Sequence, residues 1–242
     1  MLEVILIGAA TALATGLGAI PVFFLGGRAA GFEPALWGFA AGVMGVAAVV
    51  GLTLPAFREG DTATVLAGLA AGIAFLLVSR ALLGKRDITV DGHSGPSMRT
   101  SVLVFGVLLV HSLPEGFAIG TAYASDDAAL GLFVILAIAL QNIPEGTSVA
   151  IPMADAGFGR ARQFWAGVLT SVPQPVGAAI AYAAVETVES LLPFSFAFAA
   201  GAMAALVVTD LLPPALRRPA AGVAGLALGT GGMLVFSLAL GV

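Results

Sequence analysis

The stretch VHSLPEGFAIG, residues 110–120, is followed thirty residues later by the similar stretch LQNIPEGTSVA, residues 140–150. Each stretch places a polar residue and a glutamate four positions apart: His111 and Glu115 in the first, Gln141 and Glu145 in the second. Residues with this spacing lie on one face of a helix. A carboxylate at the centre of a membrane-spanning helix costs about 2.5–3.5 kcal/mol. Two successive apolar runs that bear this cost at the same depth indicate a functional polar cluster.

The composition of the chain indicates an integral membrane protein. Of its 242 residues, 59% are hydrophobic and only 10% are charged, and the mean hydropathy is +1.05. Soluble domains carry about 25% charged residues. Apolar runs of about 20 residues predict transmembrane helices. The sequence contains eight such runs, at 2–26, 34–56, 62–83, 99–124, 128–153, 161–185, 194–216 and 220–241. We therefore predict an all-α, multi-pass membrane protein with a single transmembrane domain over residues 1–242.

The basic residues predict the orientation of this domain in the membrane. One side of the eight-span arrangement carries only Arg58. The other side carries nine basic residues: Arg28, Arg80, Lys85, Arg86, Arg99, Arg160, Arg162, Arg217 and Arg218. Because cytoplasmic loops are enriched in Lys and Arg, we expect both termini outside the cytoplasm of a plasma (inner) membrane. The polar loop at about 84–98 is expected to be cytoplasmic and mobile.

The two repeated stretches predict a metal site between the fourth and fifth helices. Pro114 and Pro144 lack the N–H of a helical residue and are expected to kink these central helices. Gly116 and Gly146 leave room for a neighbouring helix or a ligand to approach closely. Imidazole, carboxylate and amide groups together suit Zn²⁺, Fe²⁺, Mn²⁺ or Co²⁺. Two alternatives remain open: a buried network without metal, with His111 hydrogen-bonded to Glu145, and a proton relay.

HSLPEG and QNIPEG resemble the paired signature of the ZIP family of divalent metal transporters, in particular its prokaryotic zinc-uptake branch. The resemblance implies eight spans across the whole chain and a homodimer. It also implies the metal ligands, which are His111, Glu115, Gln141 and Glu145, with Ser112, Asn142 and Gln174 at a second, adjacent position. Met44 corresponds to a thioether near the site, and Asp210 to an acidic residue on the cytoplasmic exit pathway.

The sequence departs from the family pattern at the second metal position. Ser112 stands where asparagine is common, and Asn142 and Gln174 stand where acidic groups are frequent. Gln141 occupies a position where many members have histidine. The second position therefore loses most of its charge, and we expect one good metal site rather than a binuclear centre.

The resemblance implies a transporter that moves a divalent metal, zinc first and iron or manganese next, into the cytoplasm by alternating access. In the family, helices one, four, five and six move against the others. The sequence has no nucleotide-binding loop of the G-x-x-x-x-G-K type, so ATP is not expected to drive transport. We expect the metal ion and the lipid bilayer as partners, with no nucleic acid, and no cofactor besides the transported metal.

Three other functions compete with that of a carrier. A metal-selective channel uses the same kind of polar cluster at mid-membrane. A non-transporting, metal-sensing homologue is compatible with the weakened second position. An intramembrane metalloenzyme fits least, because the chain has two histidines, no cysteine and a spacing of H-x-x-x-E instead of H-E-x-x-H. We therefore predict that the protein is not an enzyme.

Overall fold

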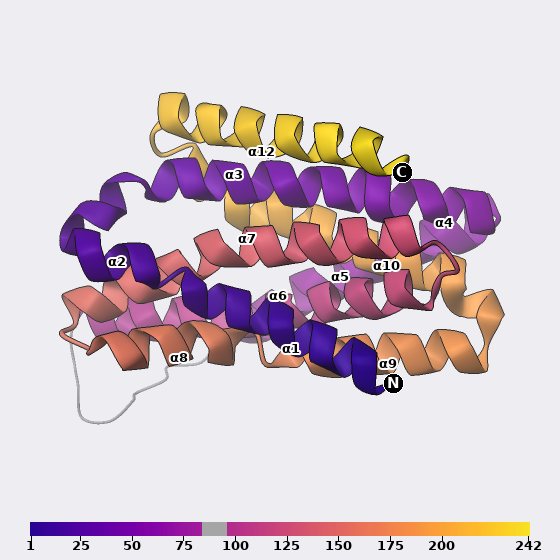
Figure 1. Ribbon diagram of the computed structural model, residues 1–242, viewed down its shortest axis with the longest axis horizontal. Helices are drawn as coiled ribbons and strands as arrows, with labels where there is room; N and C mark the ends of the chain where they lie inside the picture. Colours follow the sequence, from indigo (N-terminus) through magenta and orange to yellow (C-terminus); the bar gives the residue numbers. More distant parts are fainter. Residues whose placement is uncertain (84–95) are drawn as a thin grey trace.

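The computed structural model describes residues 1–83 and 96–242, and over these ranges the chain is helical without a strand. The helices lie side by side in one elongated bundle (Figure 1). The α-helices are α1 (Leu2–Leu17), α2 (Ile20–Leu25), α3 (Glu33–Val46), α4 (Leu54–Glu59), α5 (Thr62–Leu83), α6 (Pro96–Ala124), α7 (Ala128–Asp155), α8 (Arg160–Thr170), α9 (Pro173–Thr187), α10 (Leu192–Leu206), α11 (Leu212–Ala215) and α12 (Pro219–Leu240). Two π-helical turns, η2 (Ala47–Thr53) and η4 (Val207–Leu211), and two 3₁₀ turns, η1 (Gly26–Gly31) and η3 (Glu189–Leu191), complete the described elements.

Seven helical segments in the described part of the chain are long and apolar enough to cross a membrane. They are Leu2–Leu25, Glu33–Glu59, Thr62–Leu82, Ala128–Asp155, Arg160–Thr187, Glu189–Ala215 and Pro219–Leu240. These segments match seven of the predicted runs to within five residues at either end, and the prediction of an all-α membrane protein is confirmed. The predicted fourth span coincides with the 29-residue helix α6, whose crossing of the membrane stays a prediction. The predicted mobile loop lies largely outside the described residues.

The glycines of the two repeated motifs set the spacing of the central helices. A Cβ on Gly116 would lie 2.1 Å from the carbonyl oxygen of Gln174, and one on Gly146 would lie 1.6 Å from that of Thr15. No side chain fits at such distances, so α6 packs directly on the backbone of α9, and α7 on that of α1 (Figure 1). The expectation that these glycines admit a neighbouring helix is confirmed. Both α6 and α7 continue through their internal prolines, Pro114 and Pro144.

Small residues also join the outer helices in pairs. On α12, a Cβ would have no room at Gly222, Gly225 or Gly229. Gly225 and Gly229 lie against the backbone of α3, and Gly38 and Gly42 of α3 lie against the backbone of α12. Gly68 and Gly72 of α5 abut α10 in the same way. In lipid, where the hydrophobic effect does not drive helices together, such close backbone approach supplies the packing contacts.

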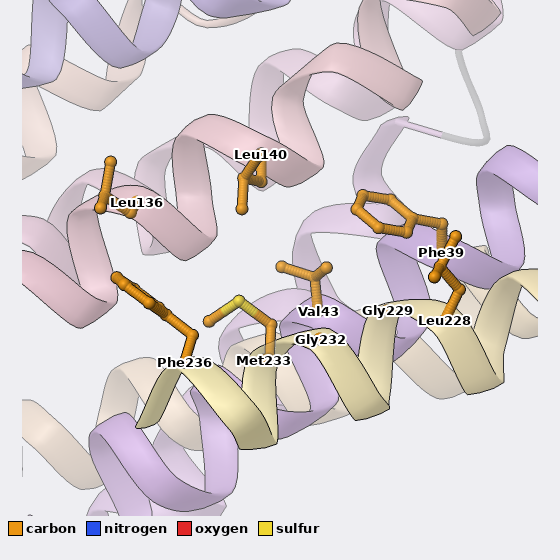
Figure 2. Close-up of a pocket in the computed structure, with 9 residues that line it drawn as sticks. All are labelled: Phe39, Val43, Leu136, Leu140, Leu228, Gly229, Gly232, Met233 and Phe236. Carbon is orange, nitrogen blue, oxygen red and sulfur yellow. The ribbon is translucent and has the colours of Figure 1, made fainter. Parts of the chain in front are cut away.

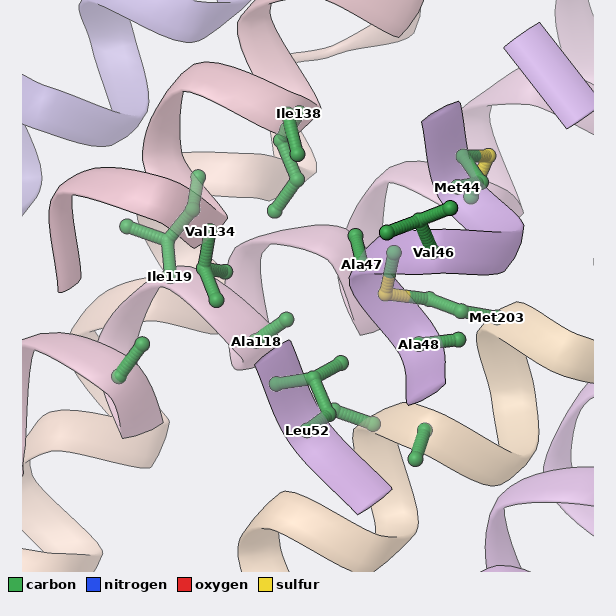
Figure 3. Close-up of a cluster of buried hydrophobic side chains, with 14 of the residues drawn as sticks. Met44, Val46, Ala47, Ala48, Leu52, Ala118, Ile119, Val134, Ile138 and Met203 are labelled. Carbon is green, nitrogen blue, oxygen red and sulfur yellow. The ribbon is translucent and has the colours of Figure 1, made fainter. Parts of the chain in front are cut away.

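An apolar cluster joins these outer pairs to the central helices (Figure 3). It includes Leu52 of η2, Ile119 of α6, Ile138 of α7 and Met203 of α10, all with at most 1% of their surface exposed. Met44 of α3 belongs to the same cluster and is completely buried. The contact between the central and outer helices in this region is therefore made by apolar side chains, both aliphatic and aromatic.

The glycine interface between α3 and α12 predicts a sharp contrast between two substitutions in one helix. A Cβ at Gly229 would lie 2.3 Å from the carbonyl oxygen of Phe39, whereas a Cβ at Gly231 meets nothing within 4 Å. Gly229→Ala should therefore lower the thermal unfolding midpoint in detergent, because α12 must move away from α3. Gly231→Ala should leave it unchanged or raise it, since alanine favours a helix by about 1 kcal/mol over glycine. Equal midpoints for the two variants would contradict this packing.

Candidate metal site

The two repeated motifs face each other inside the bundle. His111 and Glu115 lie on α6, Gln141 and Glu145 lie on α7, and each of these four residues has at most 1% of its surface exposed. The Gln141 side-chain amide joins the helices by donating a hydrogen bond of 2.8 Å from Nε2 to Glu115 Oε1. The structure thus brings together the polar faces that the spacing of the sequence motifs predicted.

A network of neutral side chains holds the Glu115 carboxylate. Gln174 of α9 donates from Nε2 to Glu115 Oε2 at 2.7 Å and to Asn142 Oδ1 at 3.2 Å. Gln141 Nε2 donates a second bond, of 2.7 Å, to Asn142 Oδ1. Asn142 Nδ2 in turn donates to the Thr11 carbonyl oxygen at 2.7 Å and to Gln174 Oε1 at 3.1 Å. Each amide therefore uses both of its N–H hydrogens, and both oxygens of Glu115 accept a bond.

Thr11 of α1 was not singled out in the sequence, although it closes this network. Its hydroxyl lies 2.8 Å from Gln174 Oε1, and its carbonyl oxygen accepts the bond from Asn142. A threonine within a run of small residues gives no local signal for such a role. Only the approach of α1 to α7 and α9 reveals it.

The other side of the site is left with buried polar atoms that lack partners. Within the described residues, both ring nitrogens of His111, Oε1 of Gln141 and Oε1 of Glu145 accept or donate no hydrogen bond. The hydrogen bond between His111 and Glu145 that the metal-free alternative required is therefore absent. Leaving a buried polar atom unpaired costs about 1–3 kcal/mol, so four such atoms on two facing helices call for a ligand. Imidazole nitrogen and carboxylate or amide oxygen are donors that suit a divalent metal.

The site is not closed around a metal in this conformation. In the part of the chain that the structure describes, no three His, Asp or Glu side chains are arranged to hold an ion. Glu115 directs both of its oxygens at the side-chain amides of Gln141 and Gln174 instead. Complete coordination of a divalent cation therefore requires side-chain or helix movement.

Asp210 lies beside His111, at the edge of the site. It sits on the π-helical turn η4, and its Oδ2 is 3.6 Å from His111 Nε2. The same oxygen accepts hydrogen bonds from the Thr209 hydroxyl, at 2.6 Å, and from the guanidinium of Arg80 on α5. The sequence identified Asp210, but Arg80 was counted only as one of the basic residues that orient the chain.

The remaining predicted residues are buried with other neighbours. Ser112 donates its hydroxyl hydrogen to the carbonyl oxygen of Leu108, one turn back in its own helix, at 3.0 Å. Met44 lies in the apolar cluster described above (Figure 3). Their roles as metal ligands stay predictions.

A separate apolar pocket of about 480 Å³ lies between α7 and the α3–α12 pair (Figure 2). It is lined by Phe39, Val43, Leu136, Leu140, Leu228, Gly229, Gly232, Met233 and Phe236. None of these residues offers a polar side chain, so the pocket is not suited to a cation. The candidate metal site is the polar cluster alone.

Comparison with known proteins identifies the family of the chain. The sequence profile of a family described as "ZIP Zinc transporter" matches residues 86–237. The zinc transporter GufA of Myxococcus xanthus is 31% identical over 219 residues, covering 84% of this chain and 85% of that protein. The zinc transporter ZIPB of Bordetella bronchiseptica is 32% identical over 251 residues, covering 97% and 80%. An Arabidopsis thaliana protein is 36% identical over 213 residues, but the match spans only 34% of its length.

These relatives are transporters rather than enzymes, as the sequence predicted. The family profile covers more than half of the chain, including both repeated motifs, α6 from its first turn, and α7 to α11 in full. The chain belongs to the ZIP zinc transporter family.

Proposed function

We propose that the protein carries zinc through the membrane into the cytoplasm, with His111, Gln141 and Glu145 as the core of its metal site. The observation that carries this proposal is the set of four buried nitrogen and oxygen atoms on α6 and α7 that make no hydrogen bond and could bind a metal. The names of the bacterial relatives, which are zinc transporters, supply the choice of metal. Iron and manganese remain candidate substrates on the same ligand chemistry.

The membrane topology proposed here has eight spans with both termini outside the cytoplasm. The 29-residue helix α6 supplies the eighth span beside the seven apolar segments. Both ends of the chain lie at the same end of the bundle (Figure 1), which agrees with an even number of crossings. The uneven distribution of Lys and Arg in the sequence supports a cytoplasmic location for the opposite end by the positive-inside rule. The similarity to bacterial zinc transporters supports our proposal that this membrane is the plasma (inner) membrane.

The second metal position is proposed to be occupied by the amide network instead of an ion. Its candidate residues, Ser112, Asn142 and Gln174, are neutral. Asn142 and Gln174 donate all of their side-chain N–H hydrogens to hydrogen bonds within the network. Glu115 is the residue that the network shares with the metal site. We propose that Glu115 and Met44 complete the coordination when the central helices move.

Alternating access is proposed to occur by movement of the central helices α1, α6, α7 and α8–α9 against α3, α5, α10 and α12. Aliphatic and aromatic side chains make up the described apolar contact between the two groups, and an apolar pocket lies beside it (Figures 2 and 3). Such a surface has few directional bonds that would have to break during sliding. A homodimer would anchor the outer helices, in line with the family resemblance.

Removal of the proposed ligands predicts a loss of transport. His111→Ala and Glu145→Ala should each lower the initial rate of ⁶⁵Zn uptake into proteoliposomes by at least about tenfold, since removal of even an outer-shell partner costs 10–100-fold in metal affinity or activity. The matched controls are His93→Ala, which removes the other histidine of the sequence, and the exposed Glu189→Ala. Native uptake that saturates with zinc indicates a carrier, whereas a linear increase favours the channel. Full activity in both ligand variants would refute the site.

The amide network predicts the number of metals bound. The native protein should bind one zinc per chain, measured by elemental analysis after equilibrium dialysis. Gln174→Glu should raise the number to two, because it places a second carboxylate beside Glu115, where the native chain has only a neutral amide. Gln163→Glu is the matched control, since it alters a buried glutamine of α8 that bonds the Phe158 carbonyl oxygen, outside the network. Two zinc ions in the native protein would show that neutral ligands suffice.

A further inference from the structure

Arg80 places a permanent positive charge beside the proposed metal site. Its guanidinium, on α5, pairs with the Asp210 carboxylate of η4. The arginine side chain is 36% exposed and the aspartate 13%, so the pair connects the buried site with the surface. The family assignment gives this arginine no role.

Arg80 bonds the Asp210 oxygen that faces His111, which is the oxygen that a metal ion leaving His111 would meet first. Asp210 Oδ2 faces His111 Nε2 at 3.6 Å, and the same oxygen receives the Arg80 guanidinium and the Thr209 hydroxyl. A metal ion that leaves His111 toward Asp210 therefore finds the carboxylate already neutralised. It also approaches a like charge, which opposes its movement.

Arg80 and Asp210 lie on elements that pack closely against each other. Helices α5 and α10 are packed backbone to backbone through Gly68 and Gly72, and η4 continues directly from α10. His111 lies on α6, which belongs to the other group of helices in the proposed movement. Asp210 and Arg80 would therefore keep their relative positions while His111 shifts past them with the metal.

We propose that Arg80 is an internal cation that competes with the transported metal for Asp210 and so closes the cytoplasmic side of the site until it releases that carboxylate. The proposal rests on the transport function proposed above and adds a gating residue to it. Arg80 acts through Asp210 and is a positioning residue rather than a metal ligand.

The test is a double-substitution cycle on zinc affinity, measured on the purified full chain by competition with a chromogenic chelator. Arg80→Gln should bind zinc about tenfold more tightly than the native protein, because it removes a like charge and frees a carboxylate. The tightening should be smaller in the Asp210→Asn background, where the substitution removes the like charge but frees no carboxylate. Arg217→Gln is the matched control, since it removes an exposed arginine outside this ion pair, and its affinity should equal that of the native protein.

Transport kinetics of the same variants distinguish a loss of gating from a partly unfolded protein. Arg80→Gln should lower both the KM for zinc and the maximal rate, because the metal is held longer at the exit. A partly unfolded variant would lower the maximal rate alone. Where Arg80→Gln does not fold, Arg80→Lys decides: lysine keeps the positive charge but lacks the planar guanidinium, so zinc affinity should rise, by less than in Arg80→Gln.

Two results would overturn the inference: native zinc affinity in the Arg80 variants, or an equal rise in affinity with and without Asp210. Neither result affects the proposed function, which is tested by zinc uptake in the native protein and in the His111 and Glu145 variants. A native protein that binds no zinc would contradict the proposed function itself.

Discussion

The structure depends on the need to stabilise carboxylates in the interior of a membrane protein. Glu115 is completely buried, and both of its oxygens accept hydrogen bonds from side-chain amides. These donors come from α7 and α9, and Thr11 of α1 closes the network behind them. One carboxylate therefore ties four of the central elements together. Glu145, four residues after Gln141, receives no such donor on Oε1, and on this difference between the two glutamates we base the proposal that metal binds on the Glu145 side.

The glycine that follows each glutamate in the repeated motif also helps to stabilise the buried carboxylates. Gly116 lets α9 approach α6 until the backbones touch, and that approach delivers Gln174 to Glu115. Gly146 does the same for α1 and α7, and brings Thr11 to Asn142. A side chain at either glycine would separate the helices and withdraw hydrogen bonds from the network. The Pro-Glu-Gly sequence thus combines a costly charge with the small residue that allows neighbouring helices to stabilise it.

Much of the fold followed from the sequence, because hydrophobic length fixes where helices cross a membrane and a spacing of four fixes which residues share a face. The paired polar faces of α6 and α7 are the clearest case. Thr11 and Arg80 were missed for a physical reason: each acts on a residue more than one hundred positions away, and no local pattern marks such a partner. Met44 shows the converse limit, because the same buried methionine suits an apolar cluster and a thioether ligand equally well.

The central claim is that one metal binds on the His111–Glu145 side and none binds within the amide network. Anomalous X-ray diffraction from crystals grown with zinc tests it most directly, because it locates the metal without reference to transport. We expect one anomalous peak per chain, about 2.0–2.2 Å from a His111 ring nitrogen and a Glu145 oxygen. A peak among Glu115, Asn142 and Gln174 that does not touch His111, or two peaks that share Glu115, would contradict the account.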